Sequence, residues 1–142
     1  MMDKFWKSFV AQVNKLANYF WQRDPIAQMQ LEYDSAVSQL KDGRTGLEQY
    51  RALVERVTRQ VAANERECER LTAQVKALLK AGDRDNAGKY AIELKRAQQE
   101  QEENRSQLKL HETSYENNVR KIKFASDRLA QVRQKIQKYD AE

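Results

Sequence analysis

Residues 71–91 have the sequence LTAQVKALLKAGDRDNAGKYA, and this stretch decides the fold. Apolar residues recur at every third or fourth position up to Leu78, and the same spacing resumes at Ala87. Between them, Gly82 suits the left-handed conformation that commonly ends a helix, and Asp83 is a good N-cap for the next helix. The stretch therefore predicts two helices joined by a tight turn.

Two stripes of apolar residues extend from this turn along the chain, with steps that alternate between three and four residues. The first stripe is apolar at 14 of 16 positions and the second at 12 of 16, whereas a chain that is 40% hydrophobic would give about six by chance. A spacing of 3.5 residues sustained over this length is typical of supercoiled helices. The first stripe comprises Ile26, Met29, Tyr33, Ala36, Leu40, Gly43, Leu47, Tyr50, Val54, Val57, Val61, Asn64, Cys68, Leu71, Val75 and Leu78. The second comprises Ala87, Tyr90, Leu94, Ala97, Gln101, Asn104, Leu108, His111, Tyr115, Asn118, Ile122, Ala125, Leu129, Val132, Ile136 and Tyr139.

These stripes predict an all-α fold in which residues 25–142 form a long antiparallel coiled-coil hairpin, with helices over 25–80 and 85–142 and a turn at 81–84. Folding the stripes back about the turn pairs positions whose residue numbers sum to 165, so that Gly43 faces Ile122. The expected hairpin core comprises Leu40, Leu47, Val57, Val61, Leu71, Leu78, Leu94, Leu108, Ile122, Leu129 and Ile136.

Gly43 and Gly46 lie inside the first long helix, where each glycine disfavours the helix by about 1 kcal/mol relative to alanine. Three interpretations stay open at this point. The glycines form a hinge, they allow a close approach between helices at Gly43 and Ile122, or they have no structural role.

Residues 2–22 are expected to form a separate amphipathic helix, because Asp24-Pro25 is a strong signal for the start of a new helix. At 100° per residue, the large apolar side chains fall within about 120° of arc, and lysines lie on the opposite side. Aromatic residues beside lysines suit the lipid headgroup boundary, where the apolar side chains enter the acyl region. The candidate membrane-binding residues are Met2, Lys4, Phe5, Trp6, Lys7, Phe9, Val13, Lys15, Leu16, Ala17, Phe20 and Trp21.

The alternative for this N-terminal helix is that its apolar face docks on a protein surface. We expect the hairpin to leave little apolar surface that could receive the helix within the same monomer. Membrane insertion is therefore favoured over docking on a neighbouring subunit.

A basic stretch at residues 117–138 contains seven cations and one acid, Asp127. The register places this stretch beside the start of the first long helix, so it would meet the same surface as the N-terminal helix. The two interpretations are a second membrane contact and an ordinary solvated face. We also expect acids on the partner helix to neutralise part of the positive charge of this stretch. These acids are Glu32, Asp34, Asp42 and Glu48.

Apolar residues also occur outside the two stripes, and a single hairpin would expose many of them. A line of exposed apolar residues along a rod favours lateral packing between hairpins in a polymer. These residues are Leu31, Val37, Leu53, Leu79, Ile92, Leu110, Val119 and Phe124.

The composition excludes several classes of function. With one His and one Cys in 142 residues and no glycine-rich phosphate loop, no nucleophile–base pair can be argued, so neither an enzyme nor a cofactor or metal site is expected. A net charge of +5 is modest, and the cations are interleaved with a packing stripe, so nucleic acid is not an expected partner. The sequence has no run of 18 apolar residues and no secretory cleavage site, so we expect a cytoplasmic protein.

The order of these parts resembles the phage shock protein A / vesicle-inducing protein in plastids family, the bacterial relatives of ESCRT-III. The resemblance rests on the segment Asp3-Lys-Phe-Trp-Lys-Ser-Phe, on Asp24-Pro25, and most specifically on the hairpin tip at residues 71–91 with its Ala-Leu, Gly-acid and Ala pattern. Family members continue with further helices, whereas this sequence ends at QKYDAE, so we expect either a shorter piece or a short member.

The resemblance implies a subunit that polymerises by lateral stacking of hairpins and that binds anionic, stressed membrane through its first helix. It also implies peripheral association with the bacterial inner membrane, and a possible AAA+ transcription activator as partner. The leading hypothesis is therefore a membrane-binding, self-assembling ESCRT-III-like subunit that remodels or protects the membrane. The alternative is a soluble coiled-coil adaptor or regulator that binds a partner protein such as a AAA+ activator.

Overall fold

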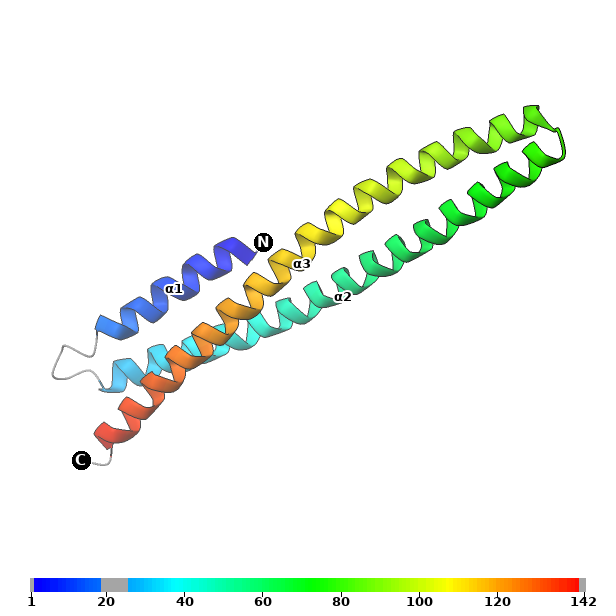
Figure 1. Cartoon of the computed structure of the whole chain (residues 1–142). Coiled ribbons are helices and arrows are strands. Elements are labelled where there is room, and N and C mark those ends of the chain that lie inside the picture. Colours follow the sequence, from blue (N-terminus) through cyan, green and yellow to red (C-terminus); the bar gives the residue numbers. More distant parts are fainter. Residues whose placement is uncertain (1, 19–25, 141–142) are drawn as a thin grey trace. The chain divides into compact units, whose positions relative to one another are not determined.

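A computed structural model describes residues 2–18 and 26–140 of the 142-residue chain. These ranges contain no strand and are helical except at one turn (Figure 1). The expected helix start at Asp24-Pro25 and the end of the expected 2–22 helix, with Phe20 and Trp21, lie outside the described residues. The helices are α1 (Met2–Asn18), α2 (Ile26–Lys80) and α3 (Arg84–Asp140).

The helices divide between two compact units. Unit 1 takes the chain up to residue 50 and again from residue 116, so it holds α1, the start of α2 and the end of α3. Unit 2 takes residues 51–115, so it holds the end of α2, the turn and the start of α3.

The turn in unit 2 has the geometry that glycine and aspartate favour. Gly82 has a φ of 77°, its N–H donates to the Leu79 carbonyl at 3.1 Å, and the Asp83 N–H donates to the Leu78 carbonyl at 2.9 Å. This pair of bonds is the Schellman motif, which satisfies the last carbonyls of a helix. Asp83 Oδ1 then accepts a hydrogen bond from the Asn86 N–H at 3.2 Å and caps α3. The roles predicted for Gly82 and Asp83 are confirmed.

Gly82→Ala should destabilise this turn, because an L-residue in the left-handed region costs about 1–2 kcal/mol. We expect the free energy of unfolding to fall by that amount in urea titrations followed by circular dichroism. Gly88→Ala is the matched control, since nothing lies within 4 Å of the added Cβ and alanine favours the helix by up to about 1 kcal/mol. Equal stability of the two variants would contradict the assigned role of Gly82.

Unit 2 is a pair of antiparallel helical segments with a narrow apolar seam. Arg105 Nη2 of α3 donates to Glu65 Oε1 of α2 at 3.0 Å across this pair. Cys68 is free and buried in the seam, as expected from its place in the first apolar stripe. Two helices cannot surround a seam on all sides, so many of its residues stay partly open to solvent. Of the predicted core residues in this unit, Val57 and Leu71 are buried, and Val61, Leu78, Leu94 and Leu108 are half-buried.

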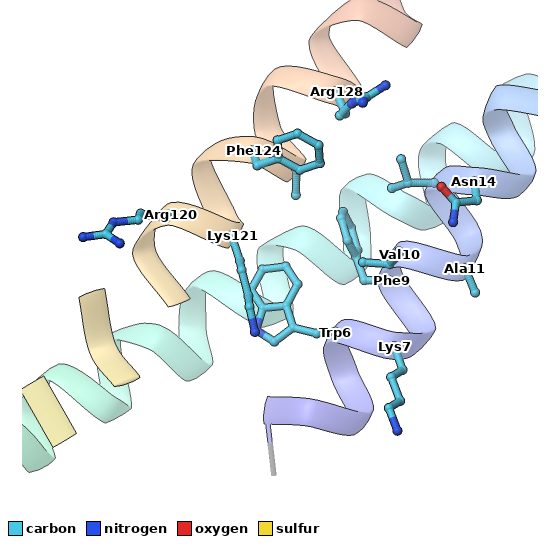
Figure 2. Close-up of a pocket in the computed structure, with 12 residues that line it drawn as sticks. Trp6, Lys7, Phe9, Val10, Ala11, Asn14, Arg120, Lys121, Phe124 and Arg128 are labelled. Carbon is cyan, nitrogen blue, oxygen red and sulfur yellow. The ribbon is translucent and has the colours of Figure 1, made fainter. Parts of the chain in front are cut away.

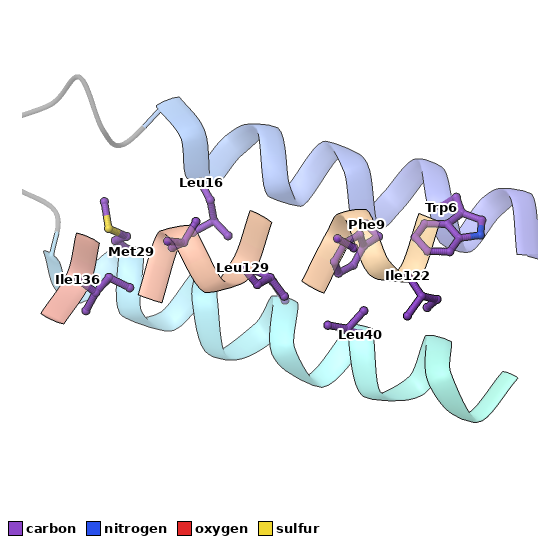
Figure 3. Close-up of a cluster of buried hydrophobic side chains, with 11 residues drawn as sticks. Trp6, Phe9, Leu16, Met29, Leu40, Ile122, Leu129 and Ile136 are labelled. Carbon is purple, nitrogen blue, oxygen red and sulfur yellow. The ribbon is translucent and has the colours of Figure 1, made fainter. Parts of the chain in front are cut away.

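Unit 1 has a closed core, because α1 covers the seam between α2 and α3 (Figure 3). Full burial of a large apolar side chain contributes roughly 1.5–3 kcal/mol, so this cluster holds the three segments together. The predicted core residues Leu40, Ile122, Leu129 and Ile136 are buried in it, and Leu47 packs against it half-buried. The buried cluster comprises Trp6, Phe9 and Leu16 of α1, Met29, Ala36 and Leu40 of α2, and Ile122, Ala125, Leu129, Val132 and Ile136 of α3.

Several large apolar side chains outside the stripes are exposed in the single chain, as predicted. Leu53 is the exception, because it is half-buried. The exposed residues of the predicted set are Leu31, Val37, Leu79, Ile92, Leu110, Val119 and Phe124.

Candidate functional site

The candidate site is the apolar face of α1 in unit 1. Phe9 and Leu16 are almost completely buried, Trp6 is buried, and Phe5 and Val13 pack at the margin of the cluster. The aromatic rings contact one another: the centroids of Phe5 and Trp6 lie 5.4 Å apart, and those of Trp6 and Phe9 lie 6.0 Å apart, both edge-to-face. These five side chains therefore lie on one apolar face of α1, as the sequence predicted for them.

The polar side of α1 carries the predicted lysines, and all three are exposed: Lys4, Lys7 and Lys15. The side chains of Met2 and Ala17, like Phe20 and Trp21, lie outside the described part of the chain. Among the side chains that the structure describes, α1 thus separates an apolar face from a cationic one.

The expectation that the chain leaves little apolar surface to receive α1 is wrong. The apolar face of α1 is buried against α2 and α3 of the same chain. The physical reason is the small size of several stripe residues in unit 1. Ala36, Gly43 and Ala125 add little volume to the seam between α2 and α3 and leave room for the larger side chains of α1.

Gly43 shows this close packing most directly. A Cβ atom on Gly43 would lie 2.7 Å from Phe5 Cζ and 3.3 Å from Ile122 Cδ1. Helix α2 continues through this position without a break. Of the three interpretations of the glycines, close approach with Gly43 facing Ile122 is confirmed for Gly43. The contact with Phe5 was missed, because the sequence does not show where α1 lies.

Gly43→Ala should loosen the first turns of α1 without unfolding unit 1. The new methyl group forces the end of the half-buried Phe5 ring to move, while alanine favours helix α2 by up to about 1 kcal/mol. We expect amide hydrogen exchange at residues 4–9 to become several-fold faster, with no fall in the melting temperature. Gly88→Ala, whose added Cβ meets nothing, should leave exchange in α1 unchanged. Unchanged exchange in Gly43→Ala would show that the Phe5 contact does not hold α1.

A buried hydrogen bond joins α1 to α3. Trp6 Nε1 donates to Asn118 Oδ1 at 3.0 Å, and both residues are buried. Lys121 Nζ lies 5.7 Å from the centroid of the Trp6 ring, within range of a cation–π contact. A hydrogen bond of this kind contributes about 0.5–1.5 kcal/mol net, but a buried group left without its partner costs about 1–3 kcal/mol. Asn118 thus acts as the acceptor for Trp6.

Glu32 of α2 makes the second polar attachment of α1. Its Oε1 lies 3.3 Å from Lys15 Nζ, and its Oε2 accepts a hydrogen bond from Gln12 Nε2 at 3.3 Å. The Lys15 side chain is 61% exposed, so this ion pair contributes only about 0–1 kcal/mol. Glu32 is therefore paired with α1 and not with the basic stretch. The same-chain partner that the structure shows for Asp34 is Gln30, also in α2, rather than the basic stretch.

The described residues offer little acid–base or metal chemistry. The pKa of Glu67 is lowered by the side-chain hydrogen bond from Arg70, but this pair is three residues apart on an exposed helix surface. No group of His, Cys, Asp and Glu within the described ranges is arranged to hold a metal ion. None of the helices described here is both long enough and apolar enough to cross a bilayer.

Comparison with known proteins assigns the chain to a family. Comparisons with curated proteins and with solved structures each gave no match. The sequence profile of the PspA/IM30 family, in contrast, matches residues 1–142, which is the whole chain. The expected resemblance is therefore confirmed, and the chain belongs to the PspA/IM30 family.

Proposed function

We propose that this chain is a membrane-binding, self-assembling subunit that remodels or protects the bacterial inner membrane through its N-terminal amphipathic helix, as ESCRT-III-like proteins do. Members of the PspA/IM30 family are generally membrane-associated, non-enzymatic proteins of the stress response that self-assemble into oligomers. The observation that carries the proposal is α1, whose apolar face is docked on unit 1 mainly by apolar burial and by few polar bonds.

For α1 itself, the interactions that differ between the docked and the lipid-bound state are weak. The apolar face lies in apolar surroundings in both states, so its transfer into acyl chains changes the hydrophobic term little. Leaving unit 1 loses the Trp6–Asn118 bond, about 1 kcal/mol, and the exposed Lys15–Glu32 pair, about 0–1 kcal/mol. Each lysine near an anionic leaflet gains roughly 1 kcal/mol, and Lys4, Lys7 and Lys15 are all available. Anionic lipid therefore favours release.

Release of α1 also exposes the seam that it covered, which includes Met29, Ala36 and Leu129. Exposing this apolar surface to water opposes release from an isolated subunit. A neighbouring subunit that covers the vacated seam would remove this penalty. We infer that membrane insertion of α1 and self-assembly are coupled through this surface.

In this proposal, residues 25–142 form a long antiparallel hairpin, and hairpins stack side by side. Lateral stacking would bury the exposed apolar residues outside the stripes, such as Leu31, Ile92 and Leu110. The subunit would lie peripherally on the cytoplasmic face of the inner membrane, with Met2, Lys4, Phe5, Trp6, Lys7, Phe9, Val13, Lys15, Leu16, Ala17, Phe20 and Trp21 as the contact residues.

Flotation with vesicles tests the proposal, and Asn118→Ala makes the test specific to α1. This variant leaves the buried Trp6 N–H without an acceptor, which weakens docking by about 1–3 kcal/mol. We expect the wild type to float with phosphatidylglycerol vesicles and not with phosphatidylcholine vesicles, and Asn118→Ala to float at lower lipid concentration. Asn104→Ala, at a half-buried stripe position in unit 2, is the matched control and should behave as the wild type.

Two outcomes would contradict the proposal. If the wild type does not float with anionic vesicles and light scattering shows a small oligomer that lipid does not change, the soluble adaptor that binds a partner protein becomes the better explanation. If the protein floats but Asn118→Ala does not differ from the wild type, membrane binding does not depend on release of α1.

A further inference from the structure

A groove of about 800 Å³ lies between α1 and α3 in unit 1 (Figure 2). Val10 of α1 and Phe124 of α3 lie on its two sides, and these residues are 49% and 60% exposed. Phe9 also lines the groove from the buried cluster. Large apolar side chains thus remain open to solvent here although α1 is docked.

Among the residues that the structure describes, the charged residues that line this groove are all of one sign. They are the cations Lys7, Arg120, Lys121 and Arg128. None of the four makes an ion pair with a residue whose side chain the structure describes. Two of them lie over aromatic rings: Lys121 over Trp6, and Arg128 over Phe124 with its Cζ atom 5.0 Å from the ring centroid. The described residues of the groove therefore combine an apolar wall with positive charge.

We propose that this groove binds one single-chain anionic amphiphile, of the class of a long-chain carboxylate, while α1 is docked. Its alkyl chain would lie between Val10 and Phe124, and its anionic head would meet the cations at the rim. The volume falls within the roughly 300–1,000 Å³ of small-molecule sites in proteins. The site shares Trp6, Lys7, Phe9 and Val13 with the proposed membrane-contact face, but the amphiphile would bind α1 and α3 together and in water.

The lining favours an alkyl chain over a peptide. A bound peptide must satisfy its backbone N–H and C=O groups, because a buried polar group without a partner is unfavourable. Among the described residues of the lining, Asn14 offers an uncharged side-chain amide, whereas the indole N–H of Trp6 already donates to Asn118. An alkyl chain makes no such demand, and its head needs only positive charge.

Binding in this groove would also regulate α1. The ligand contacts both α1 and α3 only when α1 is docked, so it stabilises the docked state by linkage. An anionic amphiphile free in solution should therefore oppose transfer of α1 to a membrane. This consequence rests on the proposed membrane function, whereas the binding itself does not.

The binding test uses Trp6 as the reporter in the full chain carrying Trp21→Phe, which leaves Trp6 as the remaining tryptophan. The probe is 11-bromoundecanoate below its micelle concentration, without vesicles, because bromine quenches nearby tryptophan fluorescence. We expect saturable quenching, and about tenfold weaker binding of the trimethylammonium analogue with the same alkyl chain, which corresponds to 1.4 kcal/mol. Equal quenching by the two head groups, or quenching that does not saturate, would overturn the proposal.

Two variants locate the binding. Phe124→Asp changes an exposed side chain, so the fold should persist by circular dichroism, but the groove loses an apolar wall and gains a negative charge. We expect quenching to be lost in this variant. Leu110→Asp is the matched control, at a residue of α3 that is 69% exposed and does not line the groove, and it should keep the wild-type quenching. Wild-type quenching in Phe124→Asp would overturn the assignment to this groove.

Hydrogen exchange tests the regulatory part. The bound carboxylate should slow amide exchange in α1 several-fold in the wild type and have no effect in Phe124→Asp. Unchanged exchange at saturating probe would overturn the linkage to docking. These experiments contain no vesicles, so a negative result would not contradict the proposed membrane binding. In the same way, a negative flotation result would not contradict ligand binding in the groove.

Discussion

Phe9→Asp should remove α1 from unit 1 and also prevent its insertion into lipid. Phe9 is 1% exposed, and burying a carboxylate in the apolar cluster at this position costs several kcal/mol of desolvation. The same carboxylate is unfavourable in the acyl region by about 2.5–3.5 kcal/mol. We expect the amides of α1 to lose their protection from hydrogen exchange, and vesicle binding to weaken by more than about tenfold.

Ala11→Asp is the control for this change, because it adds the same charge to an exposed position of α1. It should preserve protection in α1 and reduce vesicle binding only slightly. Retained protection of α1 in Phe9→Asp would show that Phe9 does not hold the helix in place.

Leu129→Ala should strongly destabilise the core of unit 1. Leu129 is buried in the three-helix cluster, and truncation of a buried leucine to alanine costs about 2–5 kcal/mol. Leu108 occupies an equivalent stripe position in unit 2 but is half-buried, so Leu108→Ala should cost about 1–2 kcal/mol. Urea titrations of both variants give the comparison. A larger loss for Leu108→Ala would contradict the difference between a closed core and an open seam.

The sequence predicted those features that depend on local chemistry. Gly82 and Asp83 mark the turn because a left-handed residue and an N-cap have strong residue preferences, and both interactions are present. The apolar spacing predicted the buried positions of unit 1, such as Leu40 and Leu129, because burial on a helix follows its period. The buried state of Cys68 follows from the same pattern.

The features that the sequence did not predict depend on contacts between segments far apart in the chain. Periodicity shows that Phe9 and Leu16 need apolar surroundings, but it does not distinguish a bilayer from a protein seam. Asn118 appeared as a polar interruption of an apolar stripe, and its partner Trp6 lies 112 residues away. A buried asparagine needs a hydrogen-bond donor, and the indole of Trp6 is a neutral donor on an apolar helix face. These two residue types were the signal from which the contact between α1 and α3 could have been predicted.

Because α1 is docked in unit 1, the proposed mechanism requires release of this helix before it binds the membrane. Three of the residues first predicted to contact lipid, Trp6, Phe9 and Leu16, are buried in unit 1. Membrane binding would then depend on the balance between anionic lipid, which favours release, and the interactions at Asn118, Glu32 and Gly43, which favour docking.

The position of Trp6 with and without membrane tests the central claim most directly. In the Trp21→Phe chain, Trp6 fluorescence should be shielded from iodide in water, because the indole is buried. Addition of phosphatidylglycerol vesicles with brominated acyl chains should then quench it strongly, as the indole moves from unit 1 into the acyl region. Protein that floats with these vesicles while Trp6 stays unquenched by the brominated chains would contradict the claim that α1 leaves unit 1 to bind the membrane.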